Sequence, residues 1–99
     1  MFFVYIVQCS DGFYYTGVTN DLTRRINEHN QGMIAGFTSK RLPVKLVYSQ
    51  EFQAVADAIN AEKQLKGWSR KKKEALIDGN FKSLIELSKS RRNPSTGSG

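Results

Sequence analysis

Three turn-forming residues between two strand-like segments constrain this chain more than any other feature of its sequence. Residues 3–9 and 13–19 are rich in aromatic and β-branched side chains, and Ser-Asp-Gly at 10–12 separates them. Aromatic and β-branched runs favour strands, and a glycine in the connection tolerates a positive φ. The pattern therefore predicts a β-hairpin with a three-residue loop.

The length of this loop decides which side chains share a face of the hairpin. Side chains alternate between the two faces of a strand, so a shift of one residue in register moves each to the other face. With three residues in the loop, Tyr5 lies opposite Gly17 and diagonal to Tyr15, and all three share one face. We therefore expect two neighbouring phenols, whereas a four-residue loop would send them to opposite faces.

A helix is expected directly after the hairpin. Asn20 or Asp21 can cap its start, and Gly32 is placed to end it. Arg25 and His29 are four residues apart, so they project from one side of this helix, one turn from each other.

The middle of the chain predicts a loop, a third strand and a second helix. Residues 32–43 form the loop, which includes the cationic pair Lys40 and Arg41. Residues 44–52 predict the strand, and apolar residues at helical spacing over 53–66 predict the helix. Three apolar side chains of the loop are expected to form a brief turn packed on the core: Met33, Ile34 and Phe37.

Further helices follow, and the fold class is α+β. Glu62 comes one turn after Ala58, so its carboxylate projects from a row of small apolar side chains. Ser69 can cap a shorter helix that ends at Gly79, and residues 81–89 predict another. The expected order is β-β-α-β-α-α-α. We expect a single domain over residues 1–89 and a disordered basic, Ser- and Gly-rich tail over 90–99.

The net charge and the cysteine content indicate what kind of partner the protein binds and in which cellular compartment it is expected. The 99 residues include 15 Lys and Arg against 9 Asp and Glu, a formal net charge of +6, which favours a polyanionic partner. The single cysteine, Cys9, lies in a strand pattern and is expected to be a buried, inert thiol. Without a basic leader before an apolar segment, or an apolar run near the roughly 18 residues of a membrane span, we expect a cytoplasmic protein. No membrane partner is expected, and the default oligomeric state is a monomer.

Several of these residues suit the hydrolysis of a phosphodiester, which needs an activated water, charge neutralisation and help for the leaving oxygen. Arg25 can bind phosphate oxygens through its planar fork and stays charged. Glu62 is a hard oxygen ligand, and Mg²⁺ takes only one or two carboxylates. A tyrosine, with a reference pKa of about 10, can act as a base where a neighbouring cation or hydrogen bond favours the phenolate.

The ordered set of these residues resembles the GIY-YIG nuclease superfamily over roughly residues 2–77. The chain is most similar to its small single-domain branch, related to the nuclease module of the bacterial excision-repair incision subunit and to intron-homing endonucleases. The family fold is a three-stranded antiparallel sheet with helices around it, which agrees with the expected order of elements. The segments that carry the resemblance are Phe3-Val4-Tyr5, Tyr15-Thr16-Gly17, Arg25, His29 and Glu62.

The resemblance implies a role for each matching residue. Tyr5 and Tyr15 correspond to the motif tyrosines, one of them the base or water-orienting group, and Gly17 corresponds to the motif glycine. It also implies a single divalent metal, Mg²⁺ or Mn²⁺, and DNA as the substrate. The chain departs from the motif where Phe3 replaces the first glycine and Thr16 the middle aliphatic residue. The remaining implied roles are catalytic arginine, active-site hydrogen-bonding partner and metal ligand, for Arg25, His29 and Glu62.

Each of these residues also has a purely structural interpretation. The two tyrosines can be half-buried sheet aromatics, and Arg25 can be a solvated helix residue. His29 can be a surface residue or a satisfied cation at the helix end. Glu62 can form an exposed i, i+4 ion pair with Lys66, worth about 0.3–0.5 kcal/mol. The structural interpretation has to explain five coincidences separately, which favours a catalytic site.

A run of basic residues surrounds the single tryptophan, Trp68, just after the end of the second predicted helix. Its cations can neutralise phosphates, whereas we expect Trp68 to fill the core where two helices meet. The sequence thus favours a structure-specific DNA endonuclease. The alternatives are a non-catalytic nucleic-acid-binding module on the same scaffold and a structural or interaction domain with an acidic protein partner. The residues expected to contact nucleic acid are Lys40, Arg41, Lys66, Arg70, Lys71, Lys72 and Lys73.

Overall fold

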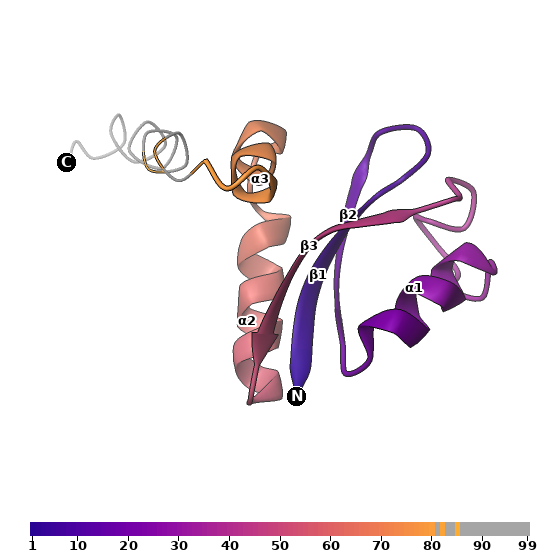
Figure 1. Cartoon of the computed structure of the whole chain (residues 1–99), viewed down its shortest axis with the longest axis horizontal. Coiled ribbons are helices and arrows are strands. Elements are labelled where there is room, and N and C mark those ends of the chain that lie inside the picture. The colour runs from indigo at the N-terminus through magenta and orange to yellow at the C-terminus, as the bar shows by residue number, and fades with distance from the viewer. Residues whose placement is uncertain (81, 83–84, 86–99) are drawn as a thin grey trace. The chain divides into compact units, whose positions relative to one another are not determined.

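A computed structural model describes residues 1–80, 82 and 85 of the chain (Figure 1). Its α+β fold and its order β-β-α-β-α-α confirm the class expected from the sequence. The predicted helix over 81–89, apart from residues 82 and 85, and the predicted tail over 90–99 lie outside the described residues. The elements are β1 (Phe2–Gln8), β2 (Tyr14–Thr19), α1 (Leu22–Asn30), β3 (Lys45–Phe52), α2 (Val55–Lys66) and α3 (Arg70–Ile77).

The chain forms two compact units, one over Met1–Lys66 and one that begins at Gly67. The first unit holds the sheet with α1 and α2, which flank it in Figure 1. The second unit holds α3, which Ser69 caps by accepting a hydrogen bond from the Lys72 amide. In the part of the chain that the structure describes, no helix is long and apolar enough to cross a membrane.

The sheet has the strand order β2-β1-β3, and both pairings are antiparallel. The central strand β1 pairs with β2 in the register predicted from the three-residue loop, with Tyr5 opposite Gly17 and Val7 opposite Tyr15. Because side chains alternate along a strand, Tyr5, Gly17 and Tyr15 share one face. The hairpin geometry that the sequence predicts is therefore confirmed.

The face of the sheet that carries the tyrosines is packed against α1. Tyr5, Val7 and Cys9 of this face are buried together with Val44, the residue before β3. The thiol of Cys9 is therefore buried, as expected from its place in a strand pattern. Partly buried apolar side chains complete this cluster: Tyr15, Leu22, Ile26 and Leu42.

Both ends of α1 follow the cues in the sequence. Of the two candidate caps, Asp21 accepts a hydrogen bond from the Arg24 amide, while the Asn20 side chain accepts one from the Arg24 guanidinium. Gly32, just beyond the end of α1, has a φ of +74°, a backbone conformation that residues other than glycine rarely adopt. These local signals position the helix that carries Arg25 and His29.

The loop between α1 and β3 differs from the prediction. Met33 is 64% exposed and Phe37 is 40% exposed, so the expected packing of these two side chains on the core is wrong. The buried residue of the loop is Thr38, at 1% exposure, because its hydroxyl hydrogen-bonds to a buried imidazole. Phe37 instead lies against other aromatic rings near the surface.

Candidate active site

The phenol of Tyr5 lies directly over the backbone of Gly17. A Cβ atom at residue 17 would lie 2.5 Å from Tyr5 Oη and 2.6 Å from Tyr5 Cζ, closer than real Cβ contacts come. Glycine is therefore the residue that leaves room for this ring. The strand pairing places the two residues opposite each other, and the missing side chain lets the ring lie across β2.

The two tyrosines and His29 form one aromatic group on this face of the sheet. The ring centroids of Tyr5 and Tyr15 are 6.5 Å apart, with the planes tilted by 48°. The His29 ring meets both edge to face, at centroid distances of 5.9 Å from Tyr5 and 5.5 Å from Tyr15. The neighbouring phenols predicted from the hairpin register are thus present.

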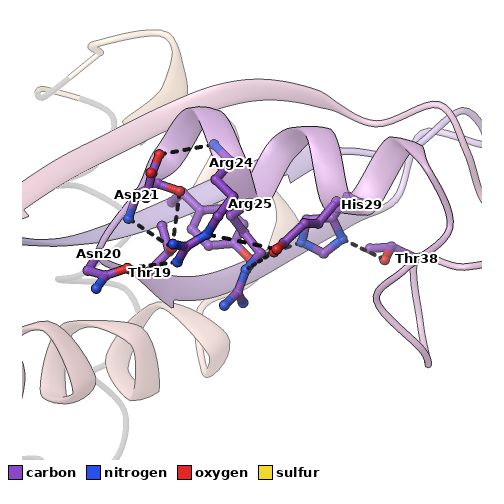
Figure 2. A network of polar contacts seen from close by, with 9 residues as sticks. Thr19, Asn20, Asp21, Arg24, Arg25, His29 and Thr38 are labelled. Carbon is purple, nitrogen blue, oxygen red and sulfur yellow. Dashed lines mark hydrogen bonds and ion pairs between the residues drawn. The ribbon is translucent and has the colours of Figure 1, made fainter.

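His29 is the centre of a buried hydrogen-bonded chain. Its Nε2 lies 2.9 Å from Tyr5 Oη, and its Nδ1 lies 2.9 Å from Thr38 Oγ1, the contact drawn between labelled residues in Figure 2. With 1% of its surface exposed, His29 is not the surface residue that the structural interpretation allowed. Burial lowers the pKa of this imidazole, and the Arg25 guanidinium lowers it further, against a smaller opposite effect of Glu28. His29 is therefore neutral near pH 7.

Thr38 is the member of the site that the sequence does not reveal. It lies in an irregular loop nine residues after His29, where no periodicity relates the two positions. With the imidazole proton on Nδ1, Thr38 accepts a hydrogen bond and Nε2 is free to accept one from the Tyr5 hydroxyl. The loop thus bears directly on the orientation of the imidazole.

Tyr5 holds its proton strongly in this environment. Burial raises the pKa of Tyr5 to about 12, and Tyr15 and Glu62 add to the increase. The Arg25 guanidinium, within hydrogen-bonding reach of the phenol, acts in the opposite direction and favours the phenolate. Tyr5 is therefore a hydroxyl donor at neutral pH, and Arg25 is the cation placed to stabilise its ionised form.

Arg25 is partly exposed and is held from its own helix. Its Nε lies 3.3 Å from Glu28 Oε1, an ion pair without the alignment of a hydrogen bond, and 30% of its side chain is exposed. The neighbouring Arg24 is more exposed, at 54% of its side chain, and also meets Glu28. Arg25, rather than Arg24, is the arginine that acts on Tyr5.

Glu62, on α2, acts on the same group of residues through its charge. Its side chain is 20% exposed, one turn beyond the fully buried Ala58, and its charge acts on the Tyr5 phenol. The ion pair of the structural interpretation is present as well, because Lys66 Nζ lies 3.2 Å from Glu62 Oε2. Glu62 therefore has two neighbours of functional interest, a phenol and an ammonium group.

The donor set around Glu62 fits one class of metal ion. Among the described residues, no group of three or more His, Cys, Asp and Glu side chains converges in a way that would hold a metal. The single carboxylate of Glu62 fits Mg²⁺, which binds one or two carboxylates and takes its other ligands from water and substrate phosphates.

The predicted nucleic-acid contacts are more constrained than the sequence suggests. In the first unit, Lys40 is exposed, Lys66 is paired with Glu62, and Arg41 is paired with Asp11 at 3.0 Å. Each pair places a carboxylate beside the cation and so fixes where Lys66 and Arg41 lie.

The second unit holds the rest of the basic run. Arg70 pairs with Glu74, and the Lys72 ammonium lies 4.3 Å from the centroid of the half-buried Trp68 ring. Lys71 is exposed, and burial lowers the pKa of the half-buried Lys73. Trp68 therefore makes a cation–π contact within its own unit.

The sheet, the tyrosine over a glycine, and the arginine, histidine and glutamate around it define the class of GIY-YIG nuclease domains. The family model described as the GIY-YIG catalytic domain matches residues 1–75. The chain belongs to this family, which confirms the resemblance seen in its sequence.

Relatives of the chain carry the name UPF0213. It is 46% identical over 77 residues to a UPF0213 protein of Halobacterium salinarum, covering 78% of this chain and all of that one. A UPF0213 protein of Streptococcus pneumoniae is 44% identical over 78 residues, with 79% of each chain covered. The name UPF0213 states no reaction.

Solved structures of similar proteins share this fold. The solution NMR structure of a UPF0213 protein from Bacillus halodurans has a TM-score of 0.52 at 42% identity, covering 79% of this chain and 84% of that one. That of a protein from E. faecalis has a TM-score of 0.55 at 34% identity, covering 80% and 84%. The GIY-YIG family is a nuclease superfamily, so the class of function is a nuclease-like action on nucleic acid.

Proposed function

We propose that this protein is a divalent-metal-dependent endonuclease that hydrolyses DNA phosphodiester bonds and selects DNA by its structure rather than its sequence. The observation that carries the proposal is that the Tyr5 phenol is hydrogen-bonded to an imidazole and that its pKa responds to the charges of a guanidinium and a carboxylate. These three groups come from two helices on different parts of the chain. A purely structural role for the phenol would not require all of them.

Arg25 suits the role of stabilising charge on the scissile phosphate. Its guanidinium is partly exposed, so phosphate oxygens can reach it, and it stays charged at every working pH. Charge-assisted hydrogen bonds of this kind are about twice as strong as neutral ones. The ion pair with Glu28 restrains the side chain before substrate binds.

Tyr5 and His29 suit the role of moving a proton. The Tyr5 hydroxyl lies 2.9 Å from Nε2 of a neutral imidazole, so His29 can take the Tyr5 proton. Arg25 stabilises the phenolate in that step. Tyr15, whose ring also meets His29, is the other candidate base.

Glu62 would hold the metal ion, with water and phosphate oxygens as its other ligands. A bound Mg²⁺ or Mn²⁺ supplies positive charge where negative charge develops on the phosphate and the leaving oxygen. The Lys66 ammonium, 3.2 Å from Glu62 Oε2, neutralises the carboxylate when no metal ion is bound. The chain thus carries its own counterion for this acid.

Two matched pairs of substitutions test the proposal. Nicked and branched DNA is incubated with Mg²⁺ or Mn²⁺ and with wild-type protein, Arg25→Ala or Glu62→Gln. The controls are Arg24→Ala, next to Arg25 and more exposed, and Asp57→Asn, an exposed acid on the same helix as Glu62. We expect Arg25→Ala and Glu62→Gln to lose about 10²–10³-fold in rate, and the controls to cleave like wild type. Equal cleavage by all four variants would contradict the proposed site.

A second candidate function is a nucleic-acid-binding module without catalysis. Two observations favour it. The raised pKa of Tyr5 keeps this phenol protonated, and the ion pair with Lys66 occupies the carboxylate of Glu62. This candidate predicts that wild type and all four variants bind DNA without a divalent metal and that none of them cleaves it. Binding should weaken as the salt concentration rises.

A further inference from the structure

A cluster of exposed aromatic side chains adjoins the candidate active site. Phe13 is 53% exposed and Phe37 is 40% exposed, and the Arg41 guanidinium lies 4.2 Å from the Phe37 ring centroid and 5.7 Å from that of Phe13. We call these three residues the Phe37 platform. Two large apolar rings held together at the surface are not explained by core packing, since single exposed apolar residues are the usual case.

The platform is built from two segments far apart in the chain. Phe13 follows the hairpin turn, whereas Phe37 and Arg41 belong to the loop before β3. Arg41 joins them, because its Nε lies 3.0 Å from Asp11 Oδ2 in the turn and its Nη1 donates to the Phe37 carbonyl at 2.8 Å. The Ser10 amide also donates to the Arg41 carbonyl, at 2.9 Å. The rings are therefore held in place before any ligand arrives.

The platform is continuous with the aromatic group of the site. The Phe37 ring is nearly parallel to that of Tyr15, with an interplanar angle of 19° and a centroid distance of 6.2 Å. Phe13 meets Phe37 edge to face at the same centroid distance. Because Tyr15 in turn meets His29, a ligand on the platform lies beside the candidate base Tyr15 and one ring away from His29.

Flat rings with a guanidinium over them match the chemistry of a nucleobase. Bases stack on aromatic side chains and on arginine planes, independently of base identity, because every base has a π-face. In a duplex both faces of a base are covered by its neighbours, so only an unpaired base can be received. The charge of Arg41 is balanced by Asp11, which makes the platform a stacking surface rather than an additional phosphate site.

On these observations we propose that Phe13, Phe37 and Arg41 form a stacking subsite for an unpaired base adjacent to the scissile phosphate. This inference rests on the proposed function and defines its substrate class, DNA with a single-stranded nucleotide at the cleavage point. Phe13 and Phe37 are then the residues that give the preference for DNA structure.

The experiment measures binding separately from cleavage. The Glu62→Gln protein is titrated, without divalent metal, with a single-stranded oligonucleotide that carries 2-aminopurine, whose fluorescence is quenched by stacking, and with its duplex. Phe13→Leu and Phe37→Leu remove the flat rings but keep apolar side chains. Met33→Ala, an exposed apolar residue of the same loop, is the control. Folding of each variant is checked by its NMR spectrum.

We expect tighter binding of the single strand than of the duplex, with quenching on binding. The Phe13→Leu and Phe37→Leu substitutions should each weaken single-strand binding about tenfold, with little effect on the duplex or in Met33→Ala. Unchanged single-strand affinity in both folded leucine variants overturns the subsite, and so does an equal loss for single strand and duplex. Stacking without cleavage by wild type supports the subsite and contradicts only the nuclease proposal.

Discussion

Gly17 lies beneath the Tyr5 phenol at a distance that admits no side chain. A methyl group at residue 17 would meet Tyr5 Oη, Cζ and Cε2 at 2.5, 2.6 and 2.9 Å. The phenol is fully buried and cannot move aside freely. The hydrogen bond to His29 and the influence of Arg25 both depend on this position of the ring.

Gly17→Ala is therefore expected to displace the Tyr5 ring. Overpacking of this kind costs about 1–3 kcal/mol in the free energy of unfolding. In a Tyr5→Ala background the same change should cost much less, because the atoms it would meet are gone. Urea unfolding of the four proteins of this double-mutant cycle measures the difference. An equal cost in both backgrounds would show that the ring does not constrain residue 17.

The pH dependence of stability should report the burial of His29. The pKa of His29 in the folded chain is lowered below the usual 6.5, so below pH 6.5 the unfolded chain takes up a proton that the folded chain refuses. This contribution to stability is complete above pH 6.5 and is lost as the pH falls through 6.5 toward the lowered value.

Because His29 is the only histidine, its titration can be followed without overlap. The imidazole NMR signal of the folded protein should have a midpoint below 6.5. The decrease in stability just below pH 6.5 should be absent from His29→Gln. A midpoint at or above 6.5 would contradict the assignment of a buried, neutral imidazole.

Thr38 should influence the site only by fixing the tautomer and orientation of the His29 imidazole. Thr38→Val keeps the shape of the side chain but removes the hydroxyl 2.9 Å from His29 Nδ1, leaving a buried polar atom unpaired at a cost of about 1–3 kcal/mol. Thr38→Ser keeps the hydroxyl and is the control. We expect the ¹⁵N NMR shifts of the imidazole, which report its tautomer, to change in Thr38→Val and to be retained in Thr38→Ser.

Removing the ammonium beside Glu62 should make the carboxylate easier for a divalent cation to bind. In Lys66→Gln, the competing charge at 3.2 Å is lost. If the protein cleaves DNA as proposed, the Mg²⁺ concentration for half-maximal rate should fall by a few fold. Lys63→Gln, an exposed lysine on the same helix, controls for net charge. A higher Mg²⁺ requirement in Lys66→Gln alone would show that Lys66 supports the site rather than competes in it.

The part of the site that could be predicted depends on local geometry. The neighbouring phenols follow from the length of one turn, because alternation along a strand then fixes every later side chain. The pairing of Arg25 and His29 on one side of α1 follows from their spacing of four. These rules need only a few consecutive residues, so the sequence is sufficient.

The part that could not be predicted consists of contacts made by irregular segments. The Asn30 side chain exchanges two hydrogen bonds with the Val44 backbone, at 2.7 and 3.1 Å, and so joins the end of α1 to the residue before β3. The path of the loop between them decides that Thr38 is buried and Phe37 exposed. Apolar content alone predicted a packed Phe37 and gave no signal for Thr38, because it takes no account of a hydroxyl that hydrogen-bonds to an imidazole.

The departure of this chain from its family motif at Thr16 can be tested through stability. Thr16 is 2% exposed, and its Oγ1 has no hydrogen-bond partner among the residues that the structure describes, so folding removes this hydroxyl from water without replacing the lost hydrogen bonds. Valine has nearly the same shape and lacks the hydroxyl. Thr16→Val is therefore expected to increase the free energy of unfolding by about 1 kcal/mol, which raises the melting temperature by about 4–8 °C.

A second buried threonine of β2 provides the control, with the opposite sign. Thr19 is 4% exposed, and its Oγ1 accepts a hydrogen bond from the Asp21 amide at 3.1 Å and lies 3.2 Å from the Asp21 carbonyl. Thr19→Val leaves the Asp21 amide without this partner and should lower the melting temperature. Thermal unfolding of the two variants under one condition makes the comparison. A loss of stability in both would mean that the Thr16 hydroxyl is satisfied in solution, and a gain in both would mean that burial of the added methyl group outweighs the hydrogen bonds.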